Sequence, residues 1–135
     1  MDLSKAMDIS ASGLRAQGAR IKVISENMAN SESGPSRPGG EPYKRKTISF
    51  KAQVDKASGA EMVKVSGYGQ DKTPPRMKFD PANPMADPDG YVPMPNINPV
   101  IEMTDMREAQ RSYEANLSMI ETSRSMIRST LDLLK

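Results

Sequence analysis

The acidic residues that begin the last third of the chain are the first candidates for chemistry. Glu102, Asp105 and Glu108 are spaced three residues apart, and paired carboxylates can serve as a general acid and a general base. The same residues also suit the first turns of a helix, where acidic side chains complement the helix dipole and Glu108 can pair with Arg111. We favour this second interpretation, because the three carboxylates lie at the start of a predicted helix that is flanked by solvent.

The chain contains no His and no Cys. This composition excludes imidazole and thiolate metal ligands, cysteine nucleophiles and Ser–His pairs. The sequence also has no glycine-rich phosphate-binding loop. We therefore predict a protein that is not an enzyme and that has no catalytic residues, no metal site and no cofactor.

Two further polar motifs have a structural and a functional interpretation. Asp87–Gly90 resembles the opening of a calcium loop, but Asn98 stands at the twelfth position, where such a loop supplies a bidentate Glu. A turn is therefore favoured.

The basic run Lys44–Lys46 could contact nucleic acid or lipid, yet no aromatic platform or wider basic stripe accompanies it. We interpret it as a solvated strand edge whose charges discourage mispairing, and we expect no nucleic-acid partner.

The composition argues against an ordinary globular domain, although 135 residues are about one domain's worth of chain. All eleven prolines lie between Gly34 and Pro99, and the aromatic residues are only four Tyr and two Phe. A large central core is therefore not expected. The sequence has no apolar run long enough to span a membrane, and its beginning lacks the pattern of a cleaved secretory signal peptide. We expect no membrane insertion, and export would need another route.

The chain from Asn98 to Lys135 predicts one long helix. Asn98 is a suitable cap, and Pro99 fits the first helical position, where no amide donor is needed. At alternating steps of three and four residues, eight of ten side chains are apolar or aromatic, which is typical of a helix that packs lengthwise on another helix. We call these positions the C-terminal stripe: Met103, Met106, Gln110, Tyr113, Leu117, Ile120, Arg124, Ile127, Leu131 and Leu134.

A similar pattern predicts an N-terminal helix over residues 3–29, with Asp2 as its cap and a stop near Asn30. Six of the eight positions in its stripe are apolar. These positions are Leu3, Met7, Ser10, Leu14, Gln17, Ile21, Ile24 and Met28. The polar members of the two stripes have two open interpretations: they fix register and partner number, or a small rotation of the helix brings them to solvent.

Residues 31–97 predict an irregular, weakly β insertion. A Ser-, Pro- and Gly-rich loop comes first, and the alternation of apolar and polar side chains over 47–54 then predicts a half-buried strand. Shorter strands are expected at 62–66 and 76–79, followed by turns and extended segments over 80–95. A small hairpin or meander is the most that this pattern supports.

The predicted fold is mainly α. Long N- and C-terminal helices pair as a coiled-coil-like hairpin, with a small irregular β-containing insertion between them. This gives three parts: the helices at 1–30 and 98–135, and the insertion at 31–97.

Two helices form too thin a layer to bury their own apolar surface, and Met119, Met126 and Leu133 would remain exposed. We therefore predict an assembly protein whose helices complete their burial against other chains. The predicted assembly interface comprises Leu3, Met7, Leu14, Ile21, Ile24, Met28, Met106, Tyr113, Leu117, Ile120, Ile127, Leu131 and Leu134.

Short motifs in both halves resemble those of the flagellar rod and hook axial proteins. Near the N-terminus these are Ile9-Ser-Ala-Ser-Gly-Leu14 and Ser25-Glu-Asn-Met-Ala-Asn30. Five further segments make the resemblance specific to the proximal-rod members of that family: residues 38–46, 90–100, 102–109, 111–116 and 130–134. The resemblance covers about residues 1–50 and 88–135. Met28 stands where the family usually has Leu, an exchange that conserves volume.

The resemblance implies a structural subunit of the proximal rod, the hollow shaft that crosses the periplasm, transmits torque and passes exported axial proteins. Its implied partners are other copies of itself, the other proximal-rod and neighbouring rod subunits, the adjoining hook–basal-body junction proteins and the flagellar type III export apparatus. That apparatus exports its substrates without a cleaved signal peptide. The terminal helices would line the inner tube, and the proline-rich middle would lie outside.

Two alternatives come from other classes of protein. A soluble helical adaptor or secreted coiled-coil effector would share the helices, but it gives no reason for the motifs at 90–116. An enzyme such as a peptidoglycan hydrolase could use the carboxylates, but no pocket-forming domain is visible in the sequence.

Overall fold

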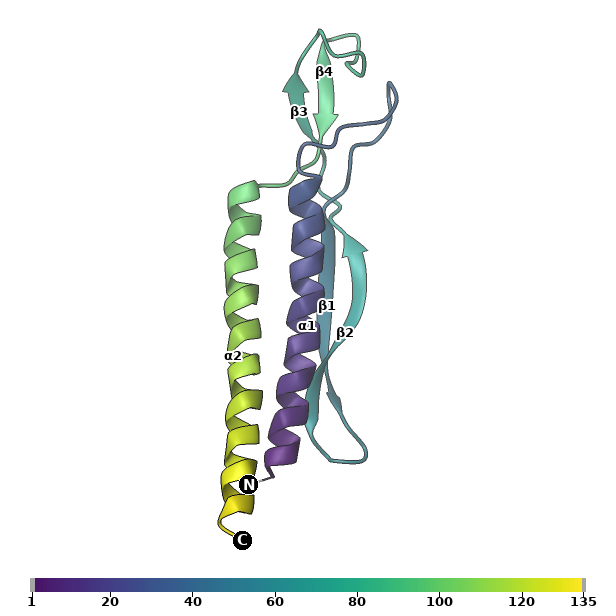
Figure 1. Ribbon diagram of the computed structural model, residues 1–135. Helices are drawn as coiled ribbons and strands as arrows, with labels where there is room; N and C mark the ends of the chain where they lie inside the picture. Colours follow the sequence, from purple (N-terminus) through teal and green to yellow (C-terminus); the bar gives the residue numbers. More distant parts are fainter. Residues whose placement is uncertain (1, 135) are drawn as a thin grey trace. The chain divides into compact units, whose positions relative to one another are not determined.

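The computed structural model describes residues 2–134 and contains, in that part of the chain, two long helices and four strands (Figure 1). Helix α1 spans Leu3–Ala29 and helix α2 spans Pro99–Asp132. The β insertion between them confirms a mainly α fold with a small antiparallel β part. Neither helix is both long and apolar enough to cross a membrane, within the described residues.

The helices begin where the capping residues predict. The side-chain oxygen Oδ1 of Asp2 accepts a hydrogen bond from the Ser4 amide at 3.1 Å, and Oδ1 of Asn98 accepts one from the Val100 amide at 3.0 Å. Each bond satisfies an amide that has no partner inside its helix. Helix α2 ends at Asp132, slightly earlier than predicted, and Lys135 lies outside the described residues.

The insertion forms two separate two-stranded sheets, so a continuous meander is not what the chain adopts. The first sheet pairs β1 (Lys46–Val54) with β2 (Glu61–Gln70), joined by a turn in which Gly59 has a φ of 66°. The second pairs β3 (Arg76–Phe79) with β4 (Tyr91–Met94) in antiparallel register. The sequence did not predict β4, because it contains Pro93. Both strands of a two-stranded sheet are edge strands, where proline is tolerated.

The prediction that β1 is half-buried is wrong for most of the strand. Phe50 is 38% exposed and Val54 is 59% exposed. Strand β1 contacts α1 at its first residue, Lys46, which bonds to Asn27. Strand β2 contacts α1 as well: Oγ of Ser12 accepts a hydrogen bond from the Val63 amide at 3.1 Å. A sheet of only two strands cannot have both of its faces buried within this small unit.

The chain divides into two compact units. Unit 1 contains the described residues within Met1–Ile21, Ile48–Gly67 and Arg107–Lys135, and unit 2 contains Lys22–Thr47 and Tyr68–Met106. Their cores differ in the size of the buried side chains. The buried apolar residues of unit 1 are Ala16, Ala60 and Ala109. Those of unit 2 are Val23, Ile24, Val92, Met94 and Ile97.

In unit 1 the two helices run side by side in opposite directions (Figure 1). A glycine marks a point of close approach: a Cβ atom at Gly13 would lie 2.8 Å from Oδ1 of Asn116. Further along the chain, Nη2 of Arg20 lies 3.7 Å from Oε2 of Glu108. At Gly18, by contrast, a Cβ atom would have no described heavy atom within 4 Å outside its own helix backbone and chain neighbours.

These two glycines form a matched pair for a stability test. Gly18→Ala should raise the free energy of unfolding by about 1 kcal/mol, because alanine is the better helix former and meets nothing. Gly13→Ala should gain less or should destabilise the protein, because the new methyl group must displace Asn116. Urea unfolding followed by circular dichroism measures both. In an Asn116→Ala background the two substitutions should become similar; a persistent difference would contradict the contact.

Candidate assembly interface

The face that α2 turns toward α1 in unit 1 consists mainly of small and polar residues. Ala109 and Ser123 are buried, and Asn116 between them is half-buried. The predicted stripe places Gln110, Leu117 and Arg124 one residue further along, and all three are exposed. Small side chains let the helices approach closely, and this sets the rotation of α2. Gln110 and Arg124 therefore reach solvent, as one of the two interpretations predicts.

The polar members of the α1 stripe are less accessible. Ser10 is 7% exposed, and Gln17 is half-buried. The oxygen Oε1 of Gln17 is buried without a hydrogen-bond partner in the described part of the chain. The second interpretation, exposure to solvent, is thus wrong for Ser10.

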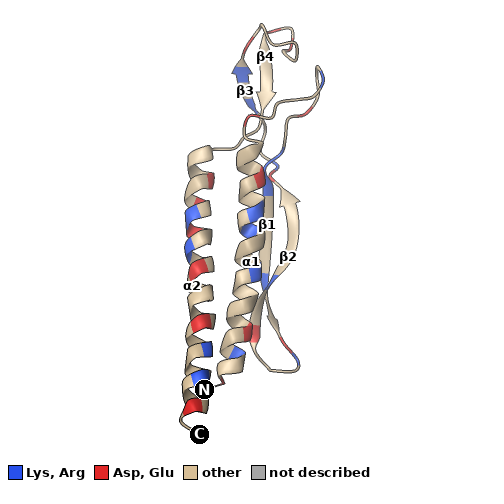
Figure 2. Ribbon diagram, in the orientation of Figure 1, with Lys and Arg blue, Asp and Glu red and all other residues tan. Residues whose placement is uncertain are grey.

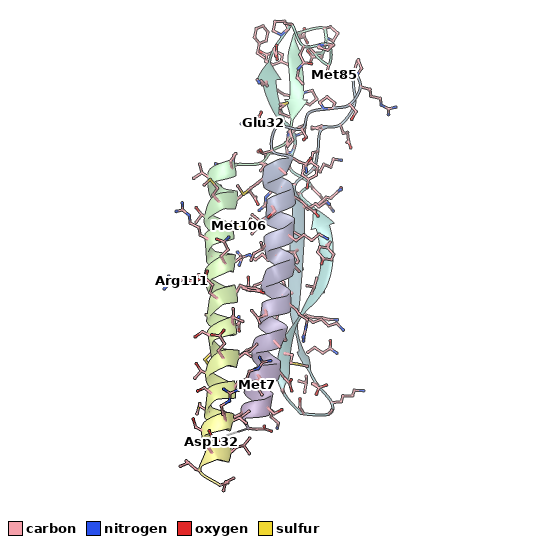
Figure 3. All side chains as sticks on the ribbon, viewed as in Figure 1. Met7, Glu32, Met85, Met106, Arg111 and Asp132 are labelled. Carbon is pink, nitrogen blue, oxygen red and sulfur yellow. The ribbon has the colours of Figure 1, made fainter. Side chains whose placement is uncertain are left out.

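Large apolar side chains of α2 remain on the surface of unit 1. Met119 is 53% exposed, Met126 is 49% exposed and Leu133 is 87% exposed, as the sequence predicts. On the same helix, Figure 3 shows Arg111 pointing away from α1, although the sequence predicts that it pairs with Glu108. Glu108 lies beside Arg20 instead. Several large apolar side chains exposed on one helix suit a surface that binds other chains, if neighbouring subunits cover them together.

The thirteen residues of the predicted interface differ in exposure. Ile24 is buried. The half-buried members are Leu3, Met7, Leu14, Ile21, Met28, Met106, Ile120 and Ile127. The exposed members are Tyr113, Leu117, Leu131 and Leu134. The exposed members are accessible to a neighbouring chain, and contact with that chain stays a prediction for the whole set.

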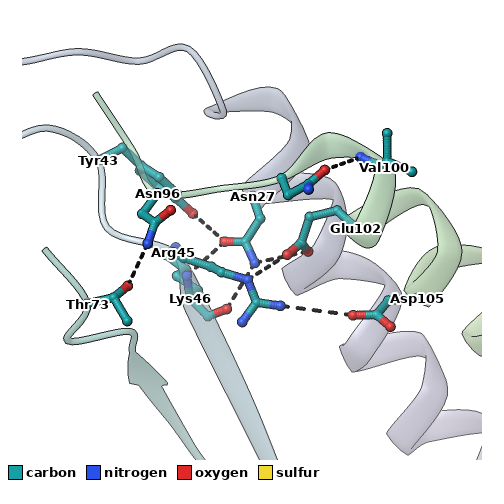
Figure 4. Close-up of polar contacts among 10 residues, drawn as sticks. Asn27, Tyr43, Arg45, Lys46, Thr73, Asn96, Val100, Glu102 and Asp105 are labelled. Carbon is teal, nitrogen blue, oxygen red and sulfur yellow. Dashed lines mark hydrogen bonds and ion pairs between the residues drawn. The ribbon is translucent and has the colours of Figure 1, made fainter. Parts of the chain in front are cut away.

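A polar cluster in unit 2 surrounds the carboxylate of Glu102, in the first turn of α2 (Figure 4). Glu102 is only 1% exposed. Its Oε1 accepts a hydrogen bond from Nε of Arg45 at 2.5 Å, and its Oε2 lies 3.5 Å from Nδ2 of Asn27. Asp105, one turn later, lies 4.0 Å from Nη2 of Arg45. The sequence predicts that the Glu102 carboxylate complements the helix dipole. In the structure it also forms an ion pair with Arg45.

Asn27 connects the end of α1 to the start of β1. Its Oδ1 accepts a hydrogen bond from the Lys46 amide at 2.8 Å, and its Nδ2 donates to the Lys46 carbonyl at 2.9 Å. The hydroxyl of Tyr43 also donates to Oδ1 at 3.2 Å. The side-chain amide thus bonds to Lys46 as the backbone of a neighbouring strand would. Asn27 is 1% exposed, so these bonds replace the water that it loses.

The basic run Lys44–Lys46 is not simply a solvated strand edge, so that interpretation is wrong. Arg45 pairs with Glu102, and Nζ of Lys44 lies 2.7 Å from Oε2 of Glu41. Nζ of Lys46 lies 2.7 Å from Oε2 of Glu26. This hydrogen bond lowers the pKa of Glu26 and raises the pKa of Lys46. The sequence alone does not indicate the pair between Arg45 and Glu102, because these residues are far apart in the chain and no local pattern connects them.

The segment Asp87–Gly90 forms a turn, as predicted. Oδ1 of Asp87 accepts hydrogen bonds from the amides of Asp89 and Tyr91, and Gly90 has a φ of 85°. Within the described residues, no group of three or more acidic side chains is placed to hold a metal ion.

Comparisons with known proteins point to one family. Residues 89–133 match the family model described as flagellar basal body rod FlgEFG protein C-terminal. Over 133 residues the chain is 50% identical to the flagellar basal-body rod protein FlgC of Agrobacterium fabrum, covering 98% of this chain and 96% of the relative. The protein of the same name from Salmonella typhimurium is 41% identical, with 98% of both chains covered. That from Borreliella burgdorferi is 39% identical, with 100% and 99% covered.

The polar cluster leads to a stability prediction. Arg45→Ala should lower the free energy of unfolding by about 3 kcal/mol, because it leaves the buried Glu102 carboxylate without its cation. Lys44→Ala is the matched control. It removes a pair of largely exposed side chains and should cost about 0–1 kcal/mol. Chemical denaturation of the purified variants gives both values. Equal losses for the two variants would show that burial of Glu102 does not matter to stability.

Proposed function

Since the chain belongs to the FlgC family of flagellar basal-body rod proteins, we propose that it builds the proximal rod through its two terminal helices. The observation that supports its role most directly is the 50% identity to a basal-body rod protein over almost the whole of both chains. It is a structural subunit of the flagellar basal-body rod and not an enzyme. The adaptor and hydrolase alternatives have no comparable support.

The terminal helices are proposed as the axial core of the rod. Helices α1 and α2, within residues 1–30 and 98–135, would pair in a coiled-coil-like manner and surround the channel, while residues 31–97 would form the outer part. The close approach of Asn116 to Gly13 supports tight pairing of the helices. Ala109 is 0% exposed whereas Leu117 is 41% exposed, so the large apolar side chain is free for a neighbour.

The partners follow from this arrangement. Other copies of the chain, the other proximal-rod subunits and neighbouring rod proteins would cover the exposed apolar side chains of α2. The resulting hollow rod would cross the periplasm, carry torque through side-chain packing and pass exported axial proteins. The subunit itself would reach the rod through the flagellar type III export apparatus, without a cleaved signal peptide.

The first experiment is electron microscopy of basal bodies from cells that lack the gene for this protein and from the same cells complemented with it. Missing or truncated rods, restored by complementation, are the expected result. Intact rods in the deletion strain would contradict the proposed function.

A substitution on α2 tests the role of the helix. Leu117→Asp should abolish rod assembly and swimming, because a charge without a partner would be buried between subunits, at a cost of several kcal/mol. Ser118→Asp is the matched control: it introduces the same charge at the adjacent exposed position, which points in a different direction. It should leave swimming unchanged. Motility in soft agar and counts of basal bodies report both, and normal swimming of the Leu117→Asp strain would rule out this packing.

A further inference from the structure

The β3–β4 hairpin of unit 2 has two unlike faces. Side chains of opposed residues in an antiparallel pair lie on the same face, and successive residues alternate between faces. One face carries Val92 and Met94, which are 2% and 7% exposed. The other face carries Met77, Phe79, Tyr91 and Pro93, which the strand register places opposite one another. On this second face Met77 is 51% exposed and Phe79 is 63% exposed.

The exposed face has a defined shape. The rings of Phe79 and Tyr91 pack edge to face, with their centroids 5.2 Å apart and their planes at 63°. Gly90 makes room for this arrangement: a Cβ atom there would lie 3.0 Å from Cε2 of Phe79. The two aromatic side chains present a large apolar area. Their packing on each other already limits their conformational freedom, which lowers the entropy cost of binding.

Three aspartates lie at the loop end of the aromatic pair, whereas Arg76 and Lys78 of β3 share the other face of the hairpin with Met94 and Val92. Asp80, Asp87 and Asp89 follow β3 and precede β4, and the sequence has no Lys or Arg between Phe79 and Met106 (Figure 2). The Asp80 amide donates to the carbonyl of Gly90 at 2.9 Å, which holds the acidic loop closed beside the rings. The hairpin face is therefore apolar in the middle and acidic at its end.

The same unit contains a groove of complementary character, with a volume of about 800 Å³. Its basic lining consists of Lys22, Lys44, Lys46 and Lys72. Glu26, Glu41 and Asp71 also line it, but Glu26 and Glu41 pair with Lys46 and Lys44. Its apolar lining includes Tyr68, which is 67% exposed, together with Pro74 and Pro75.

We propose that the acidic, aromatic face of the β3–β4 hairpin docks into the lysine-lined groove of a second copy of this chain. The aspartates would meet Lys22 and Lys72, and the Phe79 and Tyr91 rings would pack on Tyr68 and the prolines. The proposal rests on the proposed function, because it supplies a contact between copies within the rod.

The geometry of this contact suits a rod. The hairpin face and the groove share no residue, so each copy can insert its hairpin into one neighbour and receive the hairpin of another. Such a head-to-tail contact continues from copy to copy into a ring or a helix, whereas a two-fold contact stops at a dimer.

The absence of native cysteine permits a direct test. Asp89→Cys and Lys72→Cys, placed in one chain, should give a ladder of disulfide-linked dimers and higher oligomers when basal bodies from motile cells are oxidised. Asp89→Cys alone should give none, because two hairpins do not meet. The matched control combines Asp89→Cys with Lys56→Cys, an exposed lysine in the β1–β2 turn, and should also give none.

Three results would overturn the docking proposal. These are an absent ladder in basal bodies whose rods are intact, dimers formed by Asp89→Cys alone, and linkage of Asp89→Cys to a different basal-body protein. Each leaves the role as a rod subunit in place, since the presence of rods is scored separately by microscopy. Failure of that role would instead appear as normal rods in the deletion strain.

Charge reversal gives a second measurement that needs no cross-link. Asp89→Lys and Lys72→Glu should each reduce the number of assembled rods by about tenfold, because like charges would then face each other across the contact. The two changes combined should restore assembly. A combined variant that assembles no better than either single variant would overturn the proposal.

Discussion

The arrangement of unit 2 depends on a buried carboxylate. An ionised carboxylate without a partner costs several kcal/mol to remove from water, so Glu102 can be 1% exposed only where both of its oxygens find donors. Arg45 and Asn27 provide them. Asn27 is in turn bonded to the backbone of Lys46, so the end of α1, the beginning of β1 and the beginning of α2 must lie together. The loops and the β3–β4 hairpin of unit 2 connect to segments that this cluster holds together.

Unit 1 is organised on a different principle. Its interior is made of alanine and serine side chains and of the contact at Gly13, which bury little apolar area. The hydrophobic gain is roughly proportional to that area, so unit 1 gains comparatively little by folding alone. Its larger side chains, such as Leu117 and Met126, stay exposed. This is the distribution that an assembling subunit needs, because the side chains with the most to gain from burial are reserved for neighbouring chains.

The sequence predicted the features that depend on neighbouring residues. Both helices, their caps at Asp2 and Asn98, and the strand Arg76–Phe79 follow from local pattern and local hydrogen bonding. Strand β4 was missed because Pro93 masks its pattern. The cluster around Glu102 was missed for a stronger reason: its partners are distant in the chain, and only the folded backbone brings them together.

In α2 the residues that face α1 lie one position before those of the C-terminal stripe, and this offset shows which face of the helix the stripe identifies. Periodicity detects the largest apolar side chains, and here it selected Leu117 rather than the adjacent Asn116 that lies against Gly13. Successive residues differ by about 100° around a helix, so the two positions face different directions. A helix of this kind can hold one partner within its own chain through small residues and leave its large residues for another. The stripe therefore marks the face with the greatest apolar area, and in an assembly protein that face need not be the one that the chain covers itself.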